Sequence, residues 1–189
     1  MPLPNKKYNI IYADPPWSYK VWPKDTGIGR TAESHYHTMN KENIQALPIS
    51  DITEDNAVLF LWVTAPCLLE GIELIEKWGF TYKTIGFTWV KRNKIANTWF
   101  WGMGYYTRAN TELCLLATKG KTLKRISKSV HQIVDDRIMG HSQKPNSVRK
   151  NIVKLFGDLP RIELFAREEH EGWATIGNEV DGKDIRNVL

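Results

Sequence analysis

Runs of apolar residues alternate along the chain with polar stretches, and most of the runs have the length of a strand. The clearest predicted strands are 8–13 (YNIIYA), 57–63 (AVLFLWV) and 111–118 (TELCLLAT). The run at 57–63 is apolar at every position, which is typical of a strand buried on both faces. The first strand must end at the Asp-Pro-Pro of 14–16, because proline cannot continue a hydrogen-bonded ladder.

Helical patterns lie between some of these strands. Residues 67–78 carry apolar side chains at the spacing of an amphipathic helix, which Gly79 ends. Residues 145–156 form a second predicted helix, with proline in its first turn and Gly157 after its last residue. Further strands are predicted at 80–90, 161–165 and 173–176. Strands that alternate with helices indicate an α/β layered domain with a mostly parallel sheet.

Two long connections interrupt this pattern. Residues 18–40 hold two glycines, a proline and many polar side chains, and residues 91–110 are polar, aromatic and glycine-bearing. Long loops in compact domains are usually functional or mobile. We therefore expect both segments to be substrate-binding loops of a single domain, 1–189, a length that fits one domain.

The overall composition is that of an ordinary globular protein. Hydrophobic residues make up 42% of the chain and charged residues 25%, which excludes disordered, collagenous and coiled-coil proteins. Cys67 and Cys114 lie in apolar runs and are predicted to be buried, reduced thiols of a cytoplasmic protein. Residues 1–7 are followed by no signal-peptide segment, and no window approaches the roughly 20 apolar residues that span a bilayer. We therefore expect no membrane association.

The charge balance leaves two interpretations open. Lys and Arg number 26 against 21 Asp and Glu, a net charge of +5. That excess fits a soluble protein kept away from its isoelectric point, and it equally fits attraction to a polyanion such as nucleic acid. Eight tryptophans suit stacking surfaces as well as a core.

The tetrapeptide Asp14-Pro15-Pro16-Trp17 is the strongest candidate in the sequence for a catalytic motif. Ligands of parallel sheets bind at the carboxyl ends of the strands, which is where this motif stands. One interpretation is a rigid turn with a solubilising aspartate. The other is a grip on an amino group of a planar ring: one N–H bonds to the Asp14 carboxylate, the other to the Pro15 carbonyl, and Trp17 packs on the ring. In adenine, two such acceptors favour a pyramidal, nucleophilic nitrogen, and the carboxylate stabilises the positive charge that develops on alkylation.

With this motif the chain resembles the DPPW-type adenine N(6)-methyltransferases, a family that includes the eukaryotic mRNA adenosine methyltransferase and many phage and bacterial proteins. The resemblance runs from about residue 8 to residue 182. Its supporting segments are LFLWVT at 59–64, WGF at 78–80, WVK at 89–91, TELCLLATKG at 111–120, HSQKP at 141–145, IELFAR at 162–167 and GNEVDG at 177–182.

The resemblance implies a Rossmann-like methyltransferase fold with a circularly permuted motif order, in which the catalytic motif comes first and the cofactor segments come last. It implies S-adenosyl-L-methionine as methyl donor and no metal. The implied reaction methylates the N(6) amine of adenine, in DNA because the chain resembles the bare catalytic core of phage and bacterial members. Two alternatives stay open: the same reaction on RNA, and a catalytically silent, nucleic-acid-binding subunit of a heterodimer. A homodimer is also open.

The same resemblance assigns the cofactor contacts. Lys144 precedes a helix start, where anions bind, and could pair with the methionine carboxylate. Asn178 and Glu179 follow the last strand, where an amide and an acid can bond the adenine edge and ribose hydroxyls. The expected cofactor-binding residues are Ser142, Lys144, Leu164, Phe165, Arg167, Asn178 and Glu179. The alternatives are a solvated lysine, a surface salt bridge from Arg167 to Glu163 or another nearby glutamate, and a polar turn.

On the substrate side, the resemblance points to Tyr36 and Glu112. Two histidines flank Tyr36, but no cysteine or acidic ligand set stands near them, so we expect a loop over the substrate rather than a metal site. Five basic residues fall within the ten positions 119–128. We interpret Lys124, Arg125 and Lys128 of this cluster as phosphate contacts, the alternative being a solvated face.

Overall fold

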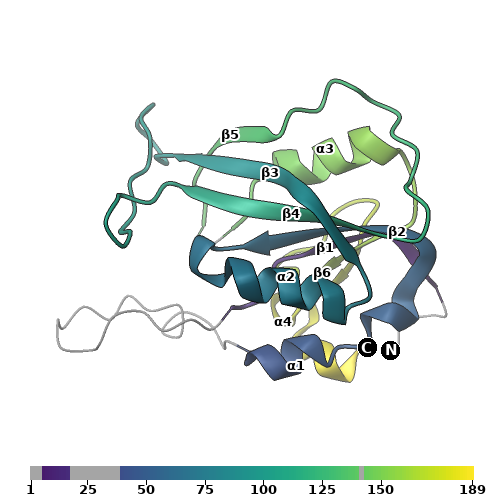
Figure 1. Cartoon of the computed structure of the whole chain (residues 1–189). Coiled ribbons are helices and arrows are strands. Elements are labelled where there is room, and N and C mark those ends of the chain that lie inside the picture. The colour runs from purple at the N-terminus through teal and green to yellow at the C-terminus, as the bar shows by residue number, and fades with distance from the viewer. Residues whose placement is uncertain (1–5, 18–38, 141–142) are drawn as a thin grey trace.

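The computed structural model describes residues 6–17, 39–140 and 143–189, and its centre is one seven-stranded sheet in the order β5-β3-β4-β2-β1-β6-β7 (Figure 1). The strands are β1 (Tyr8–Ala13), β2 (Thr53–Val63), β3 (Thr81–Arg92), β4 (Thr111–Lys119), β5 (Ile133–Arg137), β6 (Arg161–Leu164) and β7 (Ala174–Ile176). The α-helices are α1 (Lys41–Gln45), α2 (Leu68–Lys77), α3 (Asn146–Phe156) and α4 (Asn178–Asp181). The prediction of an α/β fold is confirmed.

The sheet is parallel except for β4, which runs antiparallel to both of its neighbours, β2 and β3. The other six strands therefore all end at one edge, and β4 begins there. We call this the carboxyl edge. The chain leaves β1 at this edge, leaves β3 at it, and returns to it at the start of β4, so polar residues from distant segments meet there.

Helices cover both faces of the sheet, with α3 on one side and α1 and α2 on the other (Figure 1). Alternate residues of β1 and β2 supply two separate cores, because successive side chains of a strand point to opposite faces. One core joins Ile11, Leu59, Leu61, Leu74 and Ile75; the other joins Ile10, Phe60, Trp62, Val148 and Ile152. The prediction that 57–63 is buried on both faces is confirmed, and both cysteines are buried and unpaired.

Three of the described strands and α-helices are absent from the predicted set: α1, β5 and α4. Strand β5 reads IVDDR and buries only Val134 fully, so it carries no clear alternation. It is held instead by parallel pairing with residues 88–92 of β3. Helix α1 has five residues and depends on a cap, since the Asn40 side chain accepts a hydrogen bond from the backbone N–H of Asn43 at 2.9 Å.

The two expected substrate loops differ in how much of them the structure describes. Most of the 18–40 loop, including Tyr36 and its flanking histidines, lies outside the described residues, as does Ser142. The 91–110 segment is described in full and joins β3 to β4 at the carboxyl edge. No described helix is long and apolar enough to cross a membrane.

Candidate active site at the carboxyl edge of the sheet

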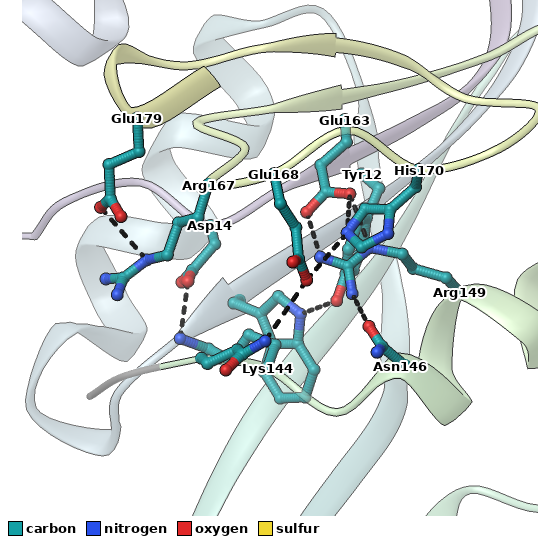
Figure 2. Close-up of polar contacts among 12 residues, drawn as sticks. Tyr12, Asp14, Lys144, Asn146, Arg149, Glu163, Arg167, Glu168, His170 and Glu179 are labelled. Atoms are coloured by element: carbon teal, nitrogen blue, oxygen red, sulfur yellow. Dashed lines mark hydrogen bonds and ion pairs between the residues drawn. The ribbon is translucent and has the colours of Figure 1, made fainter. Parts of the chain in front are cut away.

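Asp14 follows the last residue of β1 and lies beside the end of β6, where its backbone N–H donates to the Leu164 carbonyl at 3.5 Å. Its side chain is 23% exposed. The Lys144 ammonium donates to Oδ2 of this carboxylate at 2.7 Å (Figure 2). Two residues separated by 130 positions in the sequence therefore form one ion pair at the edge where the fold predicts a ligand.

A second carboxylate and a second lysine extend this pair into a network. Lys144 Nζ also lies 3.3 Å from Oε2 of Glu112, and Oε1 of Glu112 lies 2.5 Å from Lys91 Nζ. We call Asp14, Lys144, Glu112 and Lys91 the charge network. Its lysines and Glu112 are 6–18% exposed. Buried ion pairs contribute little net stability because desolvation offsets their attraction, so four such groups in one place indicate a functional site.

The network sets the ionisation of its members. Burial raises the pKa of Asp14 above its ordinary value, and the Lys144 ammonium opposes that rise. Burial lowers the pKa of Lys144, but Asp14 and Glu112 outweigh it and hold that pKa above the ordinary value. Burial likewise raises the pKa of Glu112, but the two lysines outweigh it and lower the pKa. Lys144 and Glu112 are therefore charged at neutral pH.

Within the 14–17 motif, the Trp17 ring lies in the core, whereas we expected it to pack on the substrate ring. The Trp17 ring is 8% exposed, lies in the core, and donates its indole N–H to the Trp62 carbonyl at 2.9 Å. In this position it anchors the motif to the end of β2 rather than presenting an open face. The Pro15 carbonyl accepts the backbone N–H of Trp17 at 2.8 Å, and a carbonyl oxygen has a second lone pair for an amine.

Five of the seven expected cofactor residues, Leu164, Phe165, Arg167, Asn178 and Glu179, lie at or just after the ends of β6 and β7. Phe165 has a φ of 61°, the single positive φ of a non-glycine residue in the described ranges, and such backbone strain concentrates at functional sites. Gly177 packs so closely on this turn that a Cβ there would lie 1.9 Å from the Ala166 carbonyl oxygen. The close approach brings Arg167 beside Glu179, with 3.6 Å between Nε and Oε1 (Figure 2).

These residues fit a ligand that carries a carboxylate, an amine and hydroxyl groups. Arg167 is half-buried, while Asn178 and Glu179 are exposed, so a cation, an amide and a carboxylate all face outward at this end of the sheet. Nε2 of His170, in the same connection, is buried and makes no hydrogen bond within the described residues. Leu164 is fully buried and can offer a ligand its backbone alone.

A polar cluster behind the site was missed by sequence reasoning. Arg149 of α3 donates two hydrogen bonds to Glu163 of β6, at 2.6 and 2.5 Å. Beside them, the hydroxyl of Tyr12 accepts the indole N–H of Trp62 at 2.6 Å (Figure 2). The sequence suggested Arg167 as a partner for Glu163, because the two are close along the chain. In the structure Arg149 of α3 pairs with Glu163 instead, and Arg167 lies beside Glu179.

The expected phosphate contacts lie away from the charge network. Lys124, Arg125 and Lys128 are exposed on the segment between β4 and β5, which passes over α3 (Figure 1). Within this segment, Ile126 donates its N–H to the carbonyl of Leu155, near the last residue of α3. Lys144 lies just before the first residue of that helix, and the nine residues from there to Leu155 correspond to about 14 Å at 1.5 Å per residue. The structure does not bring these residues into the site.

No group of three or more His, Cys, Asp or Glu side chains in the described ranges is arranged to hold a metal ion.

Lys91 is the member of the charge network that sequence reasoning did not single out. Its position could have identified it as a candidate site residue, because it ends the WVK segment at 89–91 and lies near the carboxyl end of a strand. The partner that fixes it, Glu112, begins the neighbouring antiparallel strand.

Comparison with known proteins gives consistent matches over almost the whole chain. The family model described as MT-A70 matches residues 8–179. The Type II methyltransferase M.MunI of Mycoplasma sp. is 37% identical over 97% of this chain and 82% of that protein. The N(6)-adenosine-methyltransferase catalytic subunit METTL3 of Homo sapiens is 27% identical over 93% of this chain and 29% of that protein. A putative N(6)-adenosine-methyltransferase of Medicago truncatula is 28% identical, with 27% of its length covered.

Proposed function

This chain belongs to the MT-A70 family, and from that premise we propose that it transfers the methyl group of S-adenosyl-L-methionine to the N(6) amine of adenine in DNA. The observation that carries the proposal is the ion pair of Asp14 with Lys144 at the carboxyl edge. It holds a largely buried carboxylate one residue before Pro15 in the chain, and the Pro15 carbonyl supplies the second acceptor. These two acceptors are what an exocyclic amine with two N–H groups requires.

Asp14 is the residue to which we assign contact with the amine. Lys144 holds Oδ2, and we assign Oδ1 to one amine N–H, with the Pro15 carbonyl on the other. Acceptance of both hydrogens draws the nitrogen lone pair out of the ring. The new N–C bond would form as the sulfonium–methyl bond breaks, so positive charge would develop on N(6), and a fixed, partly desolvated carboxylate would stabilise that charge more than water does. Loss of one N–H proton to solvent would then leave the neutral methylated amine and the demethylated thioether.

Lys144 is then a positioning residue rather than a partner of the donor carboxylate. Its ammonium faces Asp14 and Glu112 in the structure, which differs from the expectation drawn from its place before a helix. Glu112 fixes Lys144, and Lys91 fixes Glu112. Each link restricts the rotamers of the next, so that the Asp14 carboxylate keeps one orientation.

The donor is assigned to the ends of β6 and β7. When bound, S-adenosyl-L-methionine supplies a methyl group made electrophilic by its sulfonium. Arg167 would hold its carboxylate, and Asn178 and Glu179 would bond its adenine edge and ribose hydroxyls. Asp14 contacts Leu164 through the backbone, so the amine and the donor sites share one border. That proximity allows in-line alignment of the reacting atoms.

DNA is the substrate that the similarities favour. The chain shares 37% identity and most of its length with a Type II methyltransferase. It matches about a quarter of the length of the adenosine methyltransferases of plants and animals, at 27–28% identity. A catalytically silent subunit is the less favoured alternative, because the acid of the 14–17 motif and the lysine that orients it are both in place.

The test is methylation of four matched substrates with labelled donor: single- and double-stranded DNA and RNA of one sequence, digested to nucleosides and analysed by mass spectrometry. We expect N(6)-methyl-2′-deoxyadenosine from the parent protein and none from Asp14→Asn. Label in RNA alone would change the substrate to RNA. Label on a base other than adenine, or no label in any substrate while the donor binds, would contradict the proposal.

A further inference from the structure

The connection between β3 and β4 concentrates exposed apolar side chains beside the candidate site. We call residues 93–110 the aromatic hairpin. Six of the ten large apolar residues exposed in the described part of the chain belong to it: Ile95, Trp99, Trp101, Met103, Tyr105 and Tyr106. Tyr106 is 95% exposed and Trp101 55% exposed. Large exposed apolar patches mark interaction surfaces.

The backbone that carries these side chains is ordered by its own hydrogen bonds. Asn93 donates its backbone N–H to the Thr98 carbonyl at 2.9 Å, and Gly102 donates to the Ala109 carbonyl at 2.7 Å. Isolated bridges pair Arg92 with Trp99 and Gly102 with Ala109. In Figure 1 the hairpin projects beyond the sheet, past the ends of β3 and β4. The rings are therefore displayed on a folded support.

The base of the hairpin is tied to the charge network. Asn110 accepts the backbone N–H of Lys91 at 3.1 Å and donates its amide to the Lys91 carbonyl at 3.0 Å. The side chain of the same lysine pairs with Glu112, which contacts Lys144 and so reaches Asp14. A ligand lying on the hairpin thus continues from the site at which the amine is bound.

The charge of the hairpin favours a polyanion over an apolar protein partner. Residues 93–110 include Lys94 and Arg108 and no acidic residue. Arg92, at its base, lies over the Trp99 ring at 4.2 Å from the centroid. Aromatic faces combined with cations are the chemistry of single-stranded nucleic acid binding, in which bases stack on rings and phosphates meet basic side chains. A second copy of this hairpin would instead bring like charges together.

We propose that the aromatic hairpin binds unpaired nucleotides that flank the target adenine. Trp101, Tyr105 and Tyr106 stack on bases, and Lys94 and Arg108 contact phosphates. This inference rests on the proposed function for its substrate, and it assigns the recognition of flanking nucleotides to the hairpin rather than to the basic cluster at 119–128. Because stacking accepts every base, it also predicts weak sequence preference at the flanking positions.

The test compares Trp101→Ala/Tyr105→Ala/Tyr106→Ala with the parent and with Leu69→Ala, which removes an exposed apolar side chain of α2. Fluorescence anisotropy measures binding to single-stranded DNA of 4, 8 and 20 nucleotides without donor, and circular dichroism checks the fold. Parent and control should bind more tightly as length increases. The triple variant should lose this dependence and bind the 20-mer about tenfold or more weakly, since each stacked base contributes several-fold to affinity.

Equal binding of the 20-mer by the triple variant and the parent would overturn the inference. So would a parent dimer, seen by sedimentation, that the triple variant alone converts to monomer with DNA binding intact, because the surface would then be a subunit interface. Failure of the proposed function has a different signature, namely no methylated adenine from the parent protein on any substrate. Reduced binding by the triple variant would uphold the hairpin's role even then.

Discussion

Lys144 Nζ lies 2.7 Å from Asp14 Oδ2, and the lysine is 6% exposed. This contact links the turn after the first strand to the residue that precedes α3. The lysine opposes the rise that burial imposes on the pKa of Asp14, and it orients the carboxylate to which we assign the amine contact.

Replacement of Asp14 should abolish methyl transfer and leave the donor bound. Asp14→Asn keeps the shape but lacks the charge that stabilises the developing cation, so it should fail as completely as Asp14→Ala. Initial rates with labelled donor, together with calorimetric donor binding, measure the two effects. Full activity in either variant would remove Asp14 from the catalytic assignment.

Removal of the Lys144 charge should shift the pH dependence of turnover. In the proposed mechanism methyl transfer requires the Asp14 carboxylate, so the rate should fall as pH decreases through the pKa of Asp14. Burial raises this pKa above its ordinary value of about 3.9, and Lys144 opposes the rise. Lys144→Met removes that opposition and should move the acid limb of kcat to higher pH.

Lys121 is exposed, so Lys121→Met serves as the matched control and should show the same pH dependence of kcat as the parent. If Lys144→Met keeps the acid limb in place but weakens donor binding by roughly 1–3 kcal/mol, Lys144 contacts the donor carboxylate and the positioning role is wrong.

Arg167→Ala and Asn178→Ala should each weaken donor binding, by about 1–3 kcal/mol for a lost hydrogen bond to a charged or buried partner. The circular dichroism spectrum should not change, since both side chains face outward. Titration calorimetry with S-adenosyl-L-methionine gives the affinities, and Asn187→Ala is a surface control. Unchanged affinity in both variants would place the donor elsewhere.

Neutralising Lys124, Arg125 and Lys128 together should weaken nucleic acid binding about equally across sequences. If they contact phosphates, the slope of log K against log salt should fall by roughly 0.7–0.9 per contact removed. The separation of about 14 Å along α3 corresponds to roughly four nucleotides at 3.4 Å each. The affinity for substrates shorter than this should therefore be the same in the triple variant and the parent. If the triple variant binds long substrates with the same slope of log K against log salt as the parent, the cluster is a solvated face.

Trp17→Ala should destabilise the fold as well as reduce turnover. The ring is buried and its N–H is bonded to the Trp62 carbonyl, so truncation should cost about 3–5 kcal/mol of unfolding free energy. Urea denaturation measures this, and Trp101→Ala, at an exposed position, should leave the midpoint nearly unchanged. A fully stable Trp17→Ala protein with low activity would instead restore the stacking role predicted from the sequence.

The strands and helices that carry their own hydrophobic pattern could be predicted from the sequence. Strand β1, the doubly buried part of β2, and helices α2 and α3 all lie close to the predicted bounds, because burial leaves a period of two, an unbroken apolar run or a period near 3.6 in the residues themselves. The motif at 14–17 likewise locates a candidate site at a strand end. Short elements such as α1 and β5 could not be found this way, since their neighbours stabilise them.

The pairing of charges was decided by the tertiary structure. A lysine can be assigned to a helix start from sequence, but its nearest carboxylate depends on the order of strands in the sheet. That order brings β1, the antiparallel β4 and the start of α3 to one edge, so Lys144 meets Asp14 and Glu112, while Glu163 meets Arg149. The same strand order places the basic cluster at 119–128 near the last residue of α3, away from the charge network. It places the aromatic hairpin beside the site. Local periodicity records which side chains are buried; only the packing of distant segments determines which of them are within contact distance.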